Sequence, residues 1–137
     1  MENKYRLSEK AVNFFREYGI GIVYLFGSRA EGIHKDDSDF DTGIVFTDEK
    51  TTEDILELHP KLYSLFSDEF PVAFDRDVDI LYMRDCGPAF RYLVISTGSV
   101  LYEVSFEFRA EYEIRTMMEY LDFKPISDIF SKSLLER

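Results

Sequence analysis

The chain has 137 residues, of which 45% are hydrophobic, and its formal net charge is −11. This composition excludes a disordered chain, and the length predicts a single domain over residues 1–137 with a proper core. The acidic balance argues against nucleic acid as the main partner, because phosphate binding needs a basic surface. The single cysteine, Cys86, excludes an internal disulfide, and no secretory signal or apolar run of membrane-spanning length is present. We therefore expect a cytoplasmic protein without membrane association.

The first predicted elements are a helix over residues 7–18 and a strand over residues 20–26. The apolar face of the helix consists of Ala11, Phe14, Phe15 and Tyr18. Gly19 follows as a C-terminal cap. The strand is rich in β-branched and aromatic residues, which is typical of a buried strand, and it stops at Gly27-Ser28.

A short helical turn and a loop lead into a second predicted strand over residues 39–46, which opens with two carboxylates. Asp39 and Asp41 are two residues apart, so their side chains project on the same side, while Phe40 points into the core. Two such charges repel each other by about 4 kcal/mol at 4 Å for an effective dielectric constant near 20. This repulsion predicts a compensating cation, and Mg²⁺ prefers carboxylate and phosphate oxygens.

The middle of the chain predicts a helix over residues 51–70 and a third strand over residues 76–82. Thr52 is the predicted N-cap of the helix, and Pro60 is expected to kink or split it. In the strand, Asp77 and Asp79 share a face. We favour Asp79 as the partner of the first acidic pair, because it lies further into the strand between two apolar residues.

The last third predicts a short helix over residues 89–95, a strand over residues 100–103 and a long helix. Pro125 is expected to end the long helix, leaving residues 126–135 as a small amphipathic tail. Met117 and Met118 are expected to fill the core. His34 and His59 lack metal-ligand spacing with another histidine or cysteine, so both are expected at the surface.

The turn at Gly27-Ser28 has the chemistry of a phosphate site. Glycine permits close approach of a ligand to the backbone, and the N–H groups at the start of a helix favour anions. Together with the acidic pair, this pattern predicts a metal-triphosphate site and metal-dependent nucleotidyl transfer.

Gly27-Ser28, ten intervening residues and then Asp39-Phe40-Asp41 resemble the signature of the polymerase β-like nucleotidyltransferases. The resemblance implies an α/β (α+β) fold with a mixed sheet of about four strands and packed helices. It also implies that Asp39, Asp41 and Asp79 hold two Mg²⁺ ions, with Asp79 as the third carboxylate of the family. Ser28 and the backbone after Gly27 would hold the ATP phosphates, with Arg29 adding charge.

The resemblance covers nearly the whole chain and points to the minimal nucleotidyltransferase antitoxins that occur beside HEPN-domain toxins. It implies transfer of AMP from ATP to a tyrosine of the toxin, which silences its RNase activity, and a hetero-oligomer with that toxin. One alternative is a small-molecule nucleotidyltransferase of the aminoglycoside type. A second alternative is an antitoxin that acts by steric contact alone.

Overall fold

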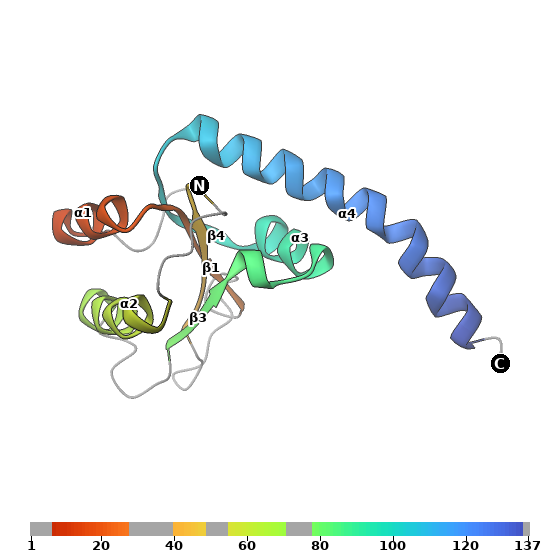
Figure 1. Ribbon diagram of the computed structural model, residues 1–137, viewed down its shortest axis with the longest axis horizontal. Coiled ribbons are helices and arrows are strands. Elements are labelled where there is room, and N and C mark those ends of the chain that lie inside the picture. The colour runs from red at the N-terminus through yellow and green to blue at the C-terminus, as the bar shows by residue number, and fades with distance from the viewer. Residues whose placement is uncertain (1–6, 28–39, 49–54, 71–77, 136–137) are drawn as a thin grey trace.

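The centre of the protein is a four-stranded mixed sheet, seen in a computed structural model that describes residues 7–27, 40–48, 55–70 and 78–135 (Figure 1). The strands are β1 (Ile20–Phe26), β2 (Phe40–Phe46), β3 (Val78–Tyr82) and β4 (Ser99–Glu103). They lie in the order β3-β2-β1-β4. β1 is antiparallel to both of its neighbours, whereas β2 and β3 are parallel. The predicted α/β fold, a mixed sheet with packed helices, is confirmed.

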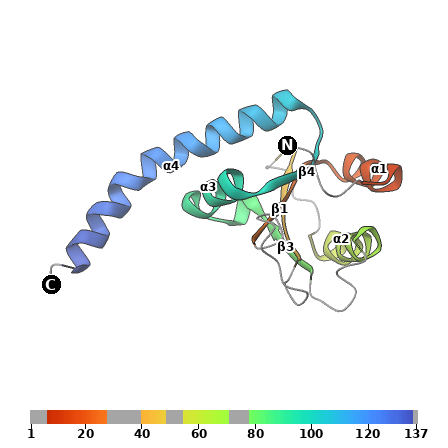
Figure 2. The same ribbon diagram turned by 180° about the vertical axis from the view of Figure 1, so that it is seen from behind.

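The helices cover both faces of this sheet (Figures 1 and 2). They are α1 (Glu9–Glu17), α2 (Ile55–Glu69), η3 (Met83–Asp85), α3 (Pro88–Thr97) and α4 (Phe106–Leu135). α1 and α2 pack on one face, where Phe15 and Phe66 meet the strands. α3 and α4 pack on the other, where Val94 and Tyr112 join Tyr24 of β1. Because β1 is covered on both sides, its residues form a continuous apolar run.

The ends of α1 follow from local chemistry. The Ser8 hydroxyl accepts a hydrogen bond from the Ala11 backbone N–H at 3.2 Å, which caps the first turn. Gly19 follows the last turn with φ +68°, a conformation that favours glycine. The predicted glycine cap is confirmed, and it turns the chain directly into β1.

The predicted helix end at Pro125 is wrong, and the helix around Pro60 is not split, because both helices continue through their prolines. α2 contains Pro60, and α4 runs from Phe106 to Leu135 with Pro125 inside it. A proline removes one backbone hydrogen bond from the ladder and leaves the others in place. In α2 the buried side chains Leu58 and Leu62 lie on either side of Pro60, so both halves of the helix are anchored in the core.

The first turns of α4 are tied to the sheet by a polar network. The Tyr24 hydroxyl of β1 donates to the Glu113 carboxylate at 3.0 Å, and Arg109 pairs with both Glu113 and Glu103 of β4. Burial and the Glu113 carboxylate raise the pKa of the Tyr24 phenol well above its usual value, so it stays a donor. This network fixes where α4 leaves the sheet.

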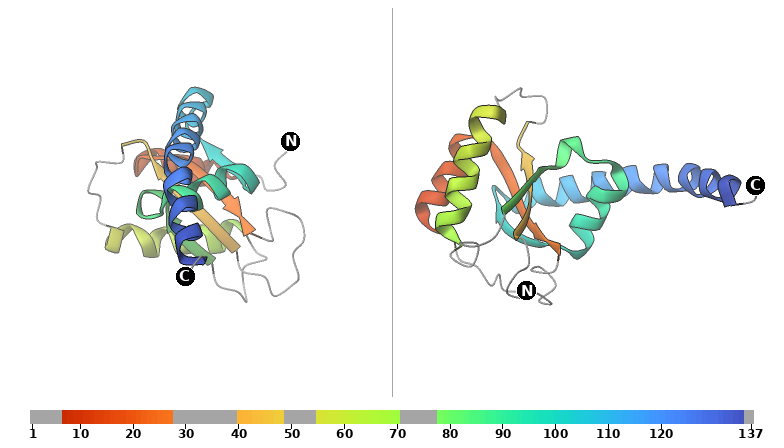
Figure 3. Two further views of the ribbon diagram at one scale, coloured as in Figure 1. Left: turned by 90° about the vertical axis from the view of Figure 1, so that its right-hand side faces the viewer. Right: turned by 90° about the horizontal axis from the view of Figure 1, so that it is seen from below.

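The far part of α4 extends beyond the sheet and the other helices (Figure 3). At about 1.5 Å per residue, its 30 residues span about 45 Å. Within the described ranges, no helix combines the length and the apolar character that crossing a bilayer requires.

Phe15 tests how much the α1–sheet packing contributes to stability. Its side chain is fully buried, with its ring centroid 4.9 Å from that of Tyr102. Phe15→Ala should lower the free energy of unfolding by about 3–5 kcal/mol, measured by urea denaturation. The matched control Leu56→Ala, at a side chain that is 87% exposed, should change it by about 0.5 kcal/mol or less.

Candidate active site

Three neighbouring strand ends bring the described site residues together. In the antiparallel pair β1–β2, Phe26 lies opposite Asp41, so Gly27 lies at the same end of the sheet. In the parallel pair β2–β3, Asp41 is the register partner of Asp79. Adjacent strands are about 4.8 Å apart, so the two carboxylates start from neighbouring backbone positions.

Asp41 and Asp79 also project from the same face of the sheet, since laterally paired residues share a face. Their strand neighbours Thr42 and Ile80 are buried on the α1–α2 side, so the carboxylates lie on the α3–α4 side. Asp79 is exposed and Asp41 is partly exposed. The pair is therefore open to a ligand from solvent.

Gly27 leaves room for the Asp41 carboxylate. A Cβ atom at Gly27 would lie 2.5 Å from Asp41 Oδ2, and Gly27 has φ +79°. No other residue type fits both this backbone conformation and this contact. Gly27 thus allows both the observed position of the Asp41 carboxylate and the turn that follows β1.

Thr42 is a positioning residue that the sequence analysis did not single out. Its side chain is fully buried, and its hydroxyl donates to the backbone carbonyl of Asp79 at 3.0 Å. This bond joins β2 to β3 at the level of the two carboxylates. A threonine inside a buried strand signals such a bond, because buried hydroxyls are almost always hydrogen-bonded.

Several predicted site residues lie outside the described residues. These are Ser28, Arg29 and Asp39, together with the alternative Asp77 and with His34. His59 is exposed on α2, as predicted, and its Nδ1 lies 3.1 Å from the Tyr82 hydroxyl.

The described carboxylate pair has the donor chemistry of a divalent-metal site. Carboxylate oxygens are the ligands that Mg²⁺ prefers, and a bound cation would lower the repulsion between two like charges on neighbouring strands. Within the described ranges no group of three or more His, Cys, Asp or Glu side chains could hold a metal ion. Asp41 and Asp79 supply two carboxylates whose chemistry suits a divalent metal, and a complete site would need further oxygen ligands.

Two aromatic rings pack against each other beside the carboxylates. Phe26, the register partner of Asp41, packs edge-on against Phe90 of α3, with their ring centroids 5.6 Å apart. The Phe26 ring also lies 3.7 Å from the position of a Cβ on Gly43. α3 thus closes the β1 side of the site, while the β2–β3 side stays open at Leu81, which is exposed.

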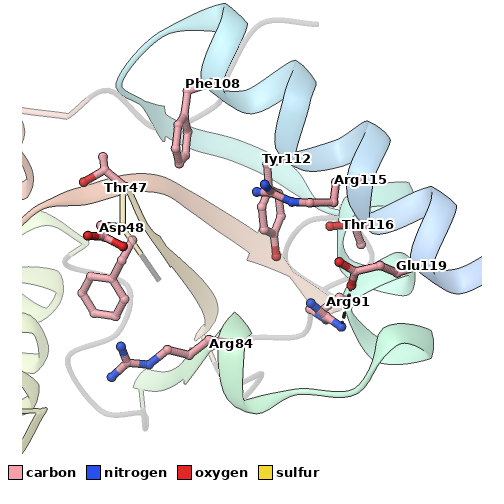
Figure 4. Close-up of a pocket in the computed structure, with 10 residues that line it drawn as sticks. Thr47, Asp48, Arg84, Arg91, Phe108, Tyr112, Arg115, Thr116 and Glu119 are labelled. Atoms are coloured by element: carbon pink, nitrogen blue, oxygen red, sulfur yellow. Dashed lines mark ion pairs between the residues drawn. The ribbon is translucent and has the colours of Figure 1, made fainter. Parts of the chain in front are cut away.

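A cavity of about 420 Å³ lies on the same side of the sheet but at the other end of β2 (Figure 4). Three arginines, Arg84, Arg91 and Arg115, line it, and Arg91 pairs with Glu119 at 2.9 Å. Phe46, on the rim of the cavity, lies five positions after Asp41, about 17 Å along the strand. The chemistry of the strand ends, and not this cavity, identifies the candidate active site.

The sequence matches the family "Polymerase beta, Nucleotidyltransferase" over residues 9–107. The chain belongs to this family. The match runs from α1 to the start of α4, so it includes the strand ends with Gly27, Asp41 and Asp79. No curated protein matches the nucleotidyltransferase chain.

Solved structures share its fold. A chain of a toxin–antitoxin crystal structure with AMP-PNP is 22% identical, with a TM-score of 0.66, over 92% of this chain and 96% of that one. A chain of the tri-AMPylated Shewanella oneidensis HEPN toxin in complex with MNT antitoxin is 22% identical, with a TM-score of 0.63, over 92% and 93%. A chain of the toxin–antitoxin MntA-HepT is 20% identical, with a TM-score of 0.63, over 92% and 94%. At these identities the likeness shows a common fold.

The carboxylate pair predicts a stability response to divalent metal. Millimolar Mg²⁺ or Mn²⁺ should raise the melting temperature of the wild-type protein, because the metal binds the folded state. Asp41→Asn should remove most of this rise, and it should slightly raise the melting temperature without metal by relieving repulsion. Asp68→Asn removes an exposed carboxylate from α2 and should keep the full response. An equal response in both variants would contradict a metal site at Asp41.

A substitution at Gly27 tests its contact with Asp41. Gly27→Ala should lower the free energy of unfolding by at least about 1–2 kcal/mol, the cost of a left-handed backbone for a residue with a Cβ. It should also weaken the metal response, because the new methyl group displaces the Asp41 carboxylate. Gly87→Ala is the control, since a Cβ there would meet nothing within 4 Å. Thermal and urea unfolding with and without Mg²⁺ measure both effects.

Proposed function

We propose that this chain is a Mg²⁺-dependent nucleotidyltransferase antitoxin that transfers AMP from ATP to a tyrosine of a HEPN RNase toxin. The observation that carries the proposal is the pairing of Asp41 with Asp79 beside Gly27, in a member of the nucleotidyltransferase family. Related folds in complexes with AMP-PNP and with an AMPylated HEPN toxin support the substrate and the acceptor.

In this proposal the carboxylates of Asp39, Asp41 and Asp79 hold the divalent metal. Bound Mg²⁺ supplies charge neutralisation at the phosphates and at the attacking oxygen. Asp79 is exposed on the outer strand β3, where an incoming hydroxyl meets it first. It acts as the general base that takes the tyrosine proton as the oxygen attacks the α-phosphorus and pyrophosphate leaves. Thr42 keeps the β3 backbone, and with it Asp79, level with Asp41.

In the proposed reaction, the turn that begins at Gly27 binds the phosphates of ATP. Its φ of +79° turns the chain at the end of β1, next to Asp41. In the proposal, Ser28 and the backbone N–H groups after Gly27 bind the β- and γ-phosphates, and Arg29 adds positive charge. Such groups hold the nucleotide in place so that the tyrosine oxygen can attack in line.

The charge of the chain favours a protein acceptor. A net charge of −11 repels a polynucleotide, whereas it attracts a basic protein that itself binds RNA. Two other functions make different predictions. A steric antitoxin would bind the toxin and leave it unmodified, and it would not need the Asp41–Asp79 pair. A small-molecule enzyme would label an aminoglycoside and ignore the toxin.

Transfer should depend on the acidic pair of the motif. With labelled ATP and Mg²⁺, the wild-type protein should label the HEPN toxin, and mass spectrometry should locate AMP on a tyrosine. Asp39→Asn/Asp41→Asn should lower the rate by more than about 100-fold, since even indirect changes at metal sites cost about 10- to 100-fold. Asp68→Asn should label at the wild-type rate.

A tRNA pool and an aminoglycoside, offered in place of the toxin, are the alternative acceptors. Label on RNA or on the drug, and never on the toxin, would overturn the acceptor. A toxin that binds tightly and stays unmodified would favour the steric antitoxin.

A further inference from the structure

α4 carries apolar side chains on two opposite faces. The inner face buries Tyr112 and Thr116, and the Tyr120 ring stacks on Tyr92 of α3 with centroids 4.2 Å apart. At about 100° per residue, a second row of apolar side chains points away from this face. This outward stripe consists of Ile114, Met117, Met118, Leu121 and Ile129. Its members are 42–67% exposed, so the predicted core role of the two methionines is wrong.

The C-terminal part of α4 projects away from the rest of the protein (Figure 3). Every side chain that the structure describes between residues 121 and 133 is exposed. This projecting end, residues 121–135, is about 22 Å long and includes the large apolar side chains Phe123 and Ile126. A helix of this length is marginal in water without packing, and Pro125 weakens it further. Burial against another molecule is the missing source of stability.

We propose that the outward stripe and the projecting end of α4 form the surface on which the HEPN toxin docks, through an apolar helix face of the toxin. This inference rests on the proposed function, which supplies the toxin as partner. Ile114, Met118 and Leu121 follow the spacing of three and four residues by which helices pack on one another.

Charge selects this partner over a second copy of the chain. Two copies would each bring a net charge of −11 and repel each other. A protein that binds RNA carries basic surface and is attracted to this chain. The exposed acidic residues Glu107, Glu111 and Asp122 lie along α4, where such a partner would meet them.

The position of α4 also suits the reaction. α3 and α4 cover the sheet face from which Asp41 and Asp79 project. A toxin held along α4 is therefore on the side of the sheet from which its tyrosine must reach Asp79. Docking on α4 would raise the concentration of the acceptor at the active site without occupying the site itself.

The test compares three full-length variants with the wild-type protein for binding to a HEPN toxin. Met118→Glu/Leu121→Glu places charges in the outward stripe. It should raise the dissociation constant by about thirtyfold or more, as expected for the loss of two interface anchors. Leu56→Glu is the matched control on the opposite side of the sheet, and it should bind within about twofold of the wild type. Asp41→Asn should bind like the wild type and transfer no AMP.

Hydrogen exchange adds a second readout, with slower exchange expected in residues 121–135 when the toxin binds. At saturating toxin, the double variant should recover the wild-type rate of AMP transfer, because its active site is unchanged. Wild-type affinity of the double variant would overturn the docking surface and leave the proposed function standing. Absence of AMP transfer by the wild-type protein, with docking lost only in the double variant, would overturn the function and keep the surface. A wild-type homodimer that the double variant dissociates would assign α4 to a second copy and overturn the proposal.

Discussion

The register of three strands is the constraint on which the candidate site depends. Asp41 lies opposite Phe26 in β1 and beside Asp79 in β3, so one slip in either pairing would send a carboxylate to the other face. Apolar residues that alternate with the acids oppose such a slip. Ile80 and Val78 bury on the α1–α2 side, and Thr42 locks the parallel pair through the Asp79 carbonyl. The core thus fixes the backbone positions from which two carboxylates project side by side.

The sheet serves two purposes with its two faces. The α1–α2 face is covered by apolar packing and contributes stability. The α3–α4 face is divided, since helices cover β1 and β4 while Leu81 and Asp79 stay exposed on the outer strand β3. Gly27 lies between the covered and the exposed part of this face, because it follows the covered strand β1 and lies next to the Asp41 carboxylate. The carboxylates of Asp41 and Asp79 can therefore lie at the edge of the core without being buried in it.

α4 shows the same division between a packed face and an exposed face. Its inner face is anchored by Arg109, Glu113 and Tyr24, a network that defines where the helix leaves β4. Its outer face repeats an apolar pattern that nothing in the described chain covers. In a small acidic protein, an exposed apolar surface of this kind is typical of an interaction site.

Sequence pattern alone determined the strands, the glycine cap at Gly19 and the motif from Gly27 to Asp41, because these depend on local spacing and backbone freedom. The pattern of the third strand singled out Asp79, and the resemblance to the polymerase β-like nucleotidyltransferases predicted the mixed sheet. Strand order and direction, the role of Thr42 and the contact between Gly27 and Asp41 were decided by tertiary structure, since they join residues far apart in the chain. The prolines show the same limit, because local preference allows a split at Pro60 and predicts an end at Pro125, where both helices continue. Helical spacing predicted that Met117 and Met118 share an apolar face, but only the direction in which α4 leaves β4 decided that this face meets solvent.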